Sequence, residues 1–174
     1  MRYAQIREMD VSNGEGVGVA LFVQGCRFHC KNCFNPDTWN FDEGKEWTSE
    51  KEREFLLLAG RPYIKRVSIL GGEPLCDENV SEVLNLIVKV RKKYPDKSIW
   101  IYTGYSWEEI INTEHGRDKW EDRKNAVSRC DVMVDGRYVD ELRDITLKWR
   151  GSRNQRVIDV GKSLHNREIK LFCD

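Results

Sequence analysis

Residues 67–102 read VSILGGEPLCDENVSEVLNLIVKVRKKYPDKSIWIY: an apolar run, a glycine turn, an amphipathic stretch and a second apolar run. Val67–Leu70 and Ser98–Tyr102 are short and rich in β-branched and aromatic residues, which predicts two strands. Between them, apolar residues recur at helical spacing from about Asp77 to Tyr94, and Pro95 ends the predicted helix. A strand–helix–strand unit of this length predicts two parallel strands joined by a right-handed crossover.

The same alternation continues on both sides of this unit. Further strands are predicted at Val17–Val23 and Asp131–Val134, with weaker candidates at Arg156–Val160 and Ile169–Phe172. Capping boxes at Ser49–Glu52 and Ser106–Glu109 predict two helix starts, the first helix ending near Gly60 and Pro62. The polar segment His115–Lys124 is expected to lead into another helix that reaches Cys130.

Strands that alternate with helices predict an α/β fold. A complete eight-fold β/α barrel usually needs roughly 250 residues, and this chain has 174. We therefore expect a partial, open β/α barrel of about five or six mostly parallel strands. Because no linker or repeat divides the sequence, residues 1–174 are expected to form a single domain.

Charge and hydropathy limit the class of protein. The chain carries 29 basic and 29 acidic side chains, and a formal net charge of zero argues against a general nucleic-acid or membrane-surface binder. No stretch approaches eighteen consecutive apolar residues, and the first residues lack the apolar core of a signal peptide. The expected location is the cytoplasm.

Three of the six cysteines lie within eight positions, in Cys26-Arg-Phe-His-Cys30-Lys-Asn-Cys33. On a helix these positions share one face, and a wrapped loop between Gly25 and Pro36 would also bring the sulfurs together. A structural zinc ion needs four protein ligands. Three thiolates on a cubane iron–sulfur cluster leave one iron open to a small molecule. Zinc with a histidine or distant cysteine as fourth ligand, and a disulfide with a spare thiol, remain alternatives.

The second motif, Gly71-Gly72-Glu73-Pro74, follows a predicted strand. Its glycines let the backbone approach a ligand closely, and Glu73 offers a carboxylate to an ammonium group. A plain strand-to-helix turn would use the same residues. Thr103-Gly-Tyr105 and Asp135-Gly136 follow the next two predicted strands. Since the carboxyl ends of parallel strands meet at one edge, we expect one site there.

Both motifs resemble those of the radical S-adenosylmethionine (SAM) superfamily. The resemblance implies a [4Fe–4S] cluster on the three cysteines, with SAM chelating the fourth iron and GGEP contacting its amino group. Many members carry an aromatic residue near the adenine just before the third cysteine, where this chain has Asn32. The implied catalytic and metal-binding residues are Cys26, Cys30 and Cys33. The implied cofactor-binding residues are Gly71, Gly72, Glu73, Pro74, Thr103, Asn32, Tyr105 and Arg150.

More of the chain resembles the activating proteins of anaerobic (class III) ribonucleoside-triphosphate reductase. The resemblance is carried by residues 33–39, 102–107, 131–136 and 150–156, and it covers nearly the whole chain. It implies an enzyme that cleaves SAM to a 5′-deoxyadenosyl radical, which takes a hydrogen atom from a glycine of the large reductase subunit. Arg150 and Asn154 are then candidates for the SAM carboxylate, in a basic segment that would alternatively dock the partner.

The implied partners are the large reductase subunit and a flavodoxin- or ferredoxin-like electron donor, with a homodimer or heterotetramer as the assembly. Neither a nucleic acid nor a membrane is expected as a partner. Three alternatives remain open: an activase for another glycyl-radical enzyme, a radical SAM enzyme acting on a small molecule (similar to 7-carboxy-7-deazaguanine synthase), and a zinc-stabilised module without catalysis.

Overall fold

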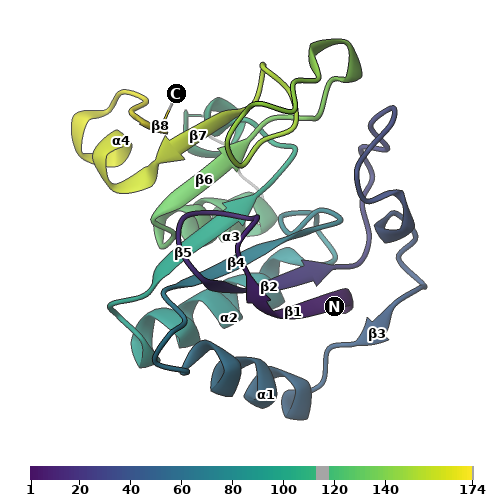
Figure 1. The fold of residues 1–174 in the computed structure, drawn as a ribbon, viewed down its shortest axis with the longest axis vertical. Coiled ribbons are helices and arrows are strands. Elements are labelled where there is room, and N and C mark those ends of the chain that lie inside the picture. Colours follow the sequence, from purple (N-terminus) through teal and green to yellow (C-terminus); the bar gives the residue numbers. More distant parts are fainter. Residues whose placement is uncertain (113–117, 174) are drawn as a thin grey trace.

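The computed structural model describes residues 1–112 and 118–173, and its centre is one eight-stranded sheet (Figure 1). In sequence, the strands are β1 (Arg2–Asp10), β2 (Gly18–Val23), β3 (Lys45–Glu46), β4 (Arg66–Gly71), β5 (Ser98–Tyr102), β6 (Val132–Asp135), β7 (Arg156–Asp159) and β8 (Leu171–Cys173). Their spatial order is β3-β1-β2-β4-β5-β6-β7-β8. The predicted α/β class is confirmed, and every predicted strand has a counterpart.

The strands β2, β4, β5 and β6 form a parallel centre. The four outer pairings are antiparallel. The prediction of five or six mostly parallel strands is therefore wrong in the number of strands and in the share of parallel pairings. β1 joins β2 through a short connection, and the only helical segment among the described residues between β6 and β7 is a three-residue 3-10 turn at Asp140–Leu142. Without a crossover helix the chain returns antiparallel. The sheet is open, with β3 and β8 at its edges in the described part of the chain; the partial-barrel geometry stays a prediction.

Helices connect the parallel strands, and the last helix joins the antiparallel strands β7 and β8. They are α1 (Ser49–Ala59), α2 (Val80–Lys93), α3 (Asp118–Ser128) and α4 (Val160–Asn166), with short turns η1 (Pro36–Thr38), η2 (Glu108–Asn112, a π-helix) and η3 (Asp140–Leu142). α3 ends before Cys130, and the start of its predicted range, at residues 115–117, lies outside the described residues. None of the described helices has the length and apolar character of a membrane span.

Two predicted helix starts differ in detail. At α1 the capping residue is Thr48 and not Ser49, because the Thr48 side chain accepts a hydrogen bond from the Lys51 amide. At Ser106 the predicted capping box is confirmed: its Oγ accepts from the Glu109 amide at 3.3 Å, and the Glu109 carboxylate accepts from the Ser106 amide at 2.7 Å. The helix that follows this box is the π-helix η2.

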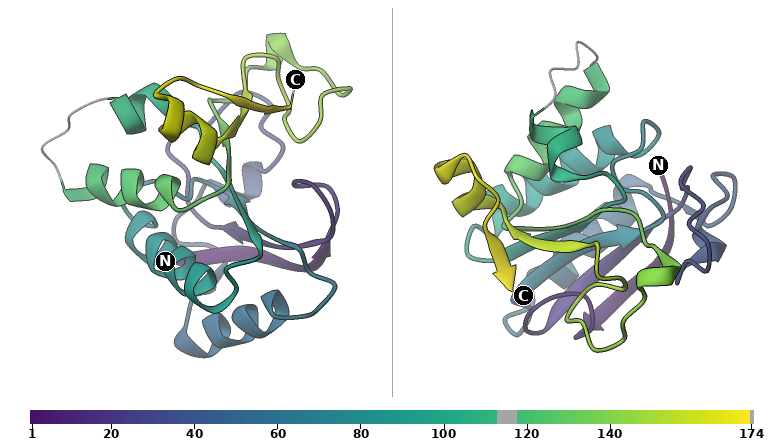
Figure 2. Two further views of the ribbon diagram at one scale, coloured as in Figure 1. Left: turned by 90° about the vertical axis from the view of Figure 1, so that its left-hand side faces the viewer. Right: turned by 90° about the horizontal axis from the view of Figure 1, so that it is seen from above.

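The two faces of the sheet are covered differently. Strand residues such as Val67 and Ile69 belong to a large apolar core that includes α2 residues Val83 and Ile87. Figure 2 shows α1, α2 and α3 on this side of the sheet. Alternate residues such as Leu70 point to the other face, where two smaller apolar clusters lie among connecting segments. The large core is therefore separate from the loop-covered face.

Candidate functional site

A cavity of about 640 Å³ lies on the loop-covered face and reaches the carboxyl ends of the parallel strands. Each of these four strands contributes a segment that follows it, so the four segments share one cavity as expected, and its use as the functional site stays a prediction. The predicted site residues that line the cavity are Cys26, Cys30, Cys33, Gly71, Gly72, Glu73, Thr103 and Arg150. Asn32, Pro74 and Tyr105 do not belong to the described lining.

The cysteines lie on a wrapped loop and not on a helix. His29 and Asn32 adopt left-handed φ angles of 45° and 54°, which turn the chain back on itself. The start of the loop is fixed by backbone hydrogen bonds from Gly25 to Thr38 (2.8 Å) and from Cys26 to Trp39 (3.1 Å). These contacts present all three sulfurs to one cavity.

The donor set of this loop suits an iron–sulfur cluster. All six cysteines are free thiols, so the disulfide alternative is wrong. The Asn35 amide donates to Cys33 Sγ at 3.4 Å. Burial raises the pKa of Cys26 to about 11, although backbone N–H groups of Phe28 and His29 oppose the shift. A buried thiolate therefore needs positive charge beside it, which bound iron ions would supply.

The described residues contain no group of three or more His, Cys, Asp or Glu side chains arranged around a single metal ion. The three thiols nevertheless share the cavity, and the remaining lining supplies polar groups and space beside them. Three cysteines with an adjoining cavity fit a cluster that binds a further small molecule.

Glu73 ties three strand ends together. Its carboxylate is 2% exposed and accepts hydrogen bonds from Thr103 Oγ1 (2.7 Å) and from the amides of Leu75 (2.9 Å) and Gly104 (2.8 Å). Burial raises the pKa of Glu73 to about 7, against these donors. Its own amide donates to the Gly25 carbonyl at 2.7 Å, which joins the GGEP turn to the cysteine loop.

The glycines of this turn are required by close packing. Gly71 has a φ of 108°, and a Cβ atom at Gly72 would collide with the Gly25 carbonyl oxygen. GGEP therefore does more than reverse the chain. It brings the backbone after β4 against the backbone after β2, directly beside the cysteines.

Tyr105 and Asn32 contact the site only through their neighbours. The Tyr105 ring packs edge-on against Phe28 at 5.0 Å, and its hydroxyl accepts a hydrogen bond from Arg123. Asn32 Nδ2 donates to Asp140 Oδ2 at 2.7 Å, linking the cysteine loop to η3. Direct contacts of Asn32, Pro74 and Tyr105 with a cofactor stay predictions.

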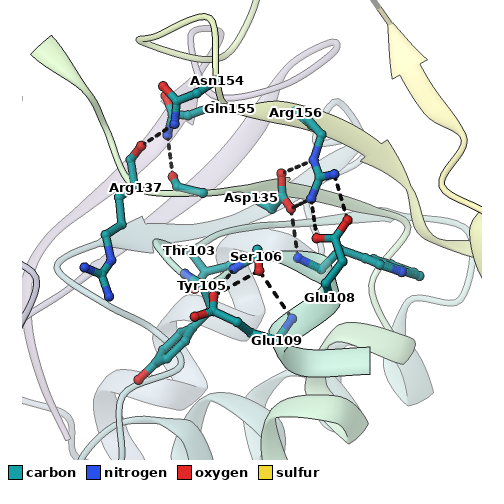
Figure 3. Close-up of polar contacts among 12 residues, drawn as sticks. Thr103, Tyr105, Ser106, Glu108, Glu109, Asp135, Arg137, Asn154, Gln155 and Arg156 are labelled. Atoms are coloured by element: carbon teal, nitrogen blue, oxygen red, sulfur yellow. Dashed lines mark hydrogen bonds and ion pairs between the residues drawn. The ribbon is translucent and has the colours of Figure 1, made fainter. Parts of the chain in front are cut away.

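The segment after β6 is held by an ion-pair cluster, shown in Figure 3. Arg156 on β7 pairs with Asp135 and, through two hydrogen bonds of 3.0 and 2.7 Å, with Glu108. Asp135 also accepts from the Trp107 amide at 2.8 Å. Asp135 is thus buried in a structural contact, and Gly136, not Asp135, lines the cavity. Asn154 donates to the Arg137 carbonyl at 2.8 Å.

A buried arginine outside the sequence motifs shapes another wall of the cavity. Arg66, at the start of β4, is fully buried and pairs with Asp10 at 2.9 Å. It also donates to the carbonyl oxygens of Asn13 (2.5 Å) and Glu15 (3.2 Å). The residues 11–17 are thereby held so that Ser12 and Asn13 line the cavity. The only sequence signal was a charged residue directly before an apolar run.

Comparisons with known proteins agree with this geometry. The family model of the 4Fe-4S single cluster domain matches residues 12–158. The anaerobic ribonucleoside-triphosphate reductase-activating protein of Vibrio cholerae is 38% identical over 157 residues, covering 89% of this chain and 96% of that protein. The proteins of the same name from Escherichia coli (36% over 159 residues; 90% and 97% covered) and Haemophilus influenzae (36% over 157 residues; 89% and 96% covered) are similar.

The matched region contains the cysteine loop, the GGEP turn and the segments after β5 and β6, and the family model describes an iron–sulfur domain and not a zinc module. The relatives match over nearly their whole length, so the likeness is not confined to one motif. The chain therefore belongs to the family of anaerobic ribonucleoside-triphosphate reductase-activating proteins, within the 4Fe-4S single cluster domain family.

Proposed function

We propose that this chain is a radical SAM activase, which generates a glycyl radical on the large subunit of anaerobic ribonucleoside-triphosphate reductase. The observation that carries the proposal is the meeting of three free thiols with the Gly71–Glu73 turn in one cavity. The family membership supplies the class of partner.

Cys26, Cys30 and Cys33 would hold a [4Fe–4S] cluster, leaving one iron for the amino and carboxylate groups of SAM. When bound, the reduced cluster supplies the electron for cleavage of SAM to a 5′-deoxyadenosyl radical. The protein binds and orients these groups. Gly71 and Gly72 permit close approach of the backbone, and Glu73, oriented by Thr103, would accept a hydrogen bond from the ammonium group.

Arg150 lines the cavity, and its Nε atom is buried without a hydrogen-bond partner in the described part of the chain. We assign it to the carboxylate of SAM, which would satisfy this donor. We assign Asn32, Pro74 and Tyr105 to the support of the loops that surround the cosubstrate. A flavodoxin- or ferredoxin-like donor, assembly as a homodimer or heterotetramer, and a cytoplasmic location complete the proposal.

The decisive experiment combines anaerobic reconstitution with iron and sulfide, reduction, and mixing with the large reductase subunit and SAM. We expect roughly four irons and four sulfides per chain, formation of 5′-deoxyadenosine, and a glycyl doublet in electron paramagnetic resonance. The triple variant Cys26→Ala, Cys30→Ala, Cys33→Ala should lose all three signals. Cys173→Ala, which changes a free thiol outside the described cavity lining, is the matched control and should keep them.

One zinc ion without sulfide would contradict the proposal. So would a loaded cluster that forms 5′-deoxyadenosine without a glycyl doublet; that result would favour a radical SAM enzyme acting on a small molecule.

A further inference from the structure

The cavity extends beyond the cysteine loop and the GGEP turn. Its lining also includes Ser12 and Asn13 from the segment before β2, Tyr102 from β5 and Trp149 from the segment before β7. Cavities that bind organic ligands span about 300–1,000 Å³, so about 640 Å³ is a substantial site. None of these four residues belongs to the cysteine or GGEP motif.

Three residues of this lining each carry a buried polar atom that has no hydrogen-bond partner among the described residues: Trp39 Nε1, Tyr102 Oη and Arg150 Nε. Indole and guanidinium N–H groups only donate hydrogen bonds, and a tyrosine hydroxyl can donate. A buried donor without an acceptor is costly, so buried polar groups in proteins are almost always paired. The cavity is therefore suited to an occupant that presents several acceptor oxygens.

Tyr102 is the member of this set that lies among apolar side chains. It packs against the cluster of Ala20, Phe22 and Leu70, and also against the cluster that contains Trp100 and Val134. Burial raises the pKa of Tyr102, so the hydroxyl keeps its proton and remains a donor at neutral pH. Trp149 packs against the second of these clusters as well, and its member Trp100 lies against Gly14, the residue after Asn13, so Tyr102 belongs to the same wall as Trp149 and the segment before β2.

A glycine-bearing peptide loop matches such a wall. Glycine has no side chain, so a protein can recognise the residue only through its shape and its main-chain amide and carbonyl groups. Apolar rings with a single hydroxyl donor leave room for a bare backbone and offer one of its carbonyl oxygens a partner. The ammonium and carboxylate groups of SAM, in contrast, need the charged groups Glu73 and Arg150.

We propose that the Tyr102 hydroxyl donates a hydrogen bond to a main-chain carbonyl group of the partner's glycine-bearing loop, which would occupy the end of the cavity lined by Ser12, Asn13 and Trp149. This assignment rests on the proposed activase function. Tyr102 is thus a binding residue for the protein substrate and not for the cosubstrate.

The variant Tyr102→Phe tests this assignment. In the free protein it removes an unpaired buried hydroxyl, so the temperature of thermal unfolding should stay unchanged or rise. Affinity for the large reductase subunit should fall roughly three- to tenfold, the worth of one neutral hydrogen bond. The dissociation constant of SAM, and formation of 5′-deoxyadenosine without the partner, should not change.

Tyr94→Phe is the matched control, because the Tyr94 hydroxyl donates to the Leu56 carbonyl at 2.8 Å and lies outside the described cavity lining. This variant should unfold at a lower temperature and bind the reductase normally. Unchanged reductase affinity in Tyr102→Phe would overturn the inference. Weaker SAM binding in that variant would overturn it as well, since the hydroxyl would then belong to the cosubstrate site.

The wild-type protein, measured in parallel, separates the two proposals. Absence of a wild-type glycyl doublet would refute the proposed function itself. A normal wild-type doublet together with unchanged reductase affinity of Tyr102→Phe would refute only the role of Tyr102.

Discussion

At the scale of single residues, Arg66 shows how a buried charge can shape a site without touching its chemistry. The guanidinium group is fully buried with the carboxylate of Asp10, and its other donors bind backbone carbonyls of residues 10–16. A buried ion pair contributes little relative to an apolar pair, yet removing one partner leaves the other charge uncompensated. The main role of the Arg66–Asp10 pair is therefore to hold Ser12 and Asn13 in position at the cavity wall.

We expect Arg66→Leu to lower the free energy of unfolding by about 3 kcal/mol or more, because Asp10 would stay buried without its cation. Denaturant titration measures the change. Arg61→Ala is the control: its ion pair with Glu8 is exposed, so the loss should stay within about 1 kcal/mol. A loss for Arg66→Leu no larger than that of the control would contradict the buried network.

Glu73 illustrates a second principle at this scale. The sequence predicted that this carboxylate contacts an ammonium group, and the structure shows that it already accepts three hydrogen bonds from the chain. An ionised carboxylate has about four acceptor sites. Glu73 can therefore join β4 to β5 and still offer one acceptor position to an ammonium group.

At the scale of elements, the junction between the segments after β2 and β4 determines whether the cysteines face Glu73. Two backbone hydrogen bonds form it, from Gly72 to Val23 (2.9 Å) and from Glu73 to Gly25 (2.7 Å). The absence of a side chain at Gly72 is what lets these backbones meet. The GGEP motif is thus as much a packing device as a binding motif.

We expect Gly72→Ala to separate this junction, because its Cβ atom would meet backbone and not a movable side chain. After reconstitution, the variant should bind less iron and less SAM than the wild type. Its free energy of unfolding should fall by roughly 1–3 kcal/mol. Gly161→Ala in α4 is the control, since a Cβ atom there makes only an ordinary contact at 3.8 Å. It should be neutral or stabilising by up to about 1 kcal/mol. Wild-type iron content in Gly72→Ala would contradict this view of the turn.

At the scale of the whole molecule, stability and chemistry are placed on opposite faces of one sheet. The large apolar core lies between the sheet and α1, α2 and α3, whereas the cysteine loop belongs to the other face. The predicted cluster is consequently attached at an edge of the fold and does not replace its core.

From this separation we expect the triple cysteine-to-alanine variant to remain folded. Its far-ultraviolet circular dichroism should match that of the wild type, and its unfolding should stay cooperative. The reason is that the residues of the large core are packed without any contribution from Cys26, Cys30 or Cys33. Collapse of the variant to an unfolded chain would show instead that cluster binding supplies the folding free energy, as in small zinc domains.

The parts of the fold that the sequence predicted are those governed by local pattern. The strand–helix–strand unit at residues 67–102, the capping box at Ser106 and the glycine turn all follow from periodicity and residue type. The wrapped cysteine loop could not be told from a helix, because spacing alone allows both. The sequence did not predict β1, because its apolar and polar residues do not alternate cleanly. Its pairing with β2 is also irregular, with two shifts of register.

The sequence by itself determined the chemistry: three thiols at fixed spacing, a glycine-rich turn with one carboxylate, and parallel strands that carry both to one edge. Tertiary structure alone decided the direction of the outer strands, the structural use of Asp135, and the wall built by Arg66 and Tyr102. The physical reason is the distance along the chain over which each kind of interaction acts. Motifs and periodicity act over a few residues, whereas strand pairing, burial of a charge and an unpaired hydroxyl depend on contacts between residues far apart in the chain.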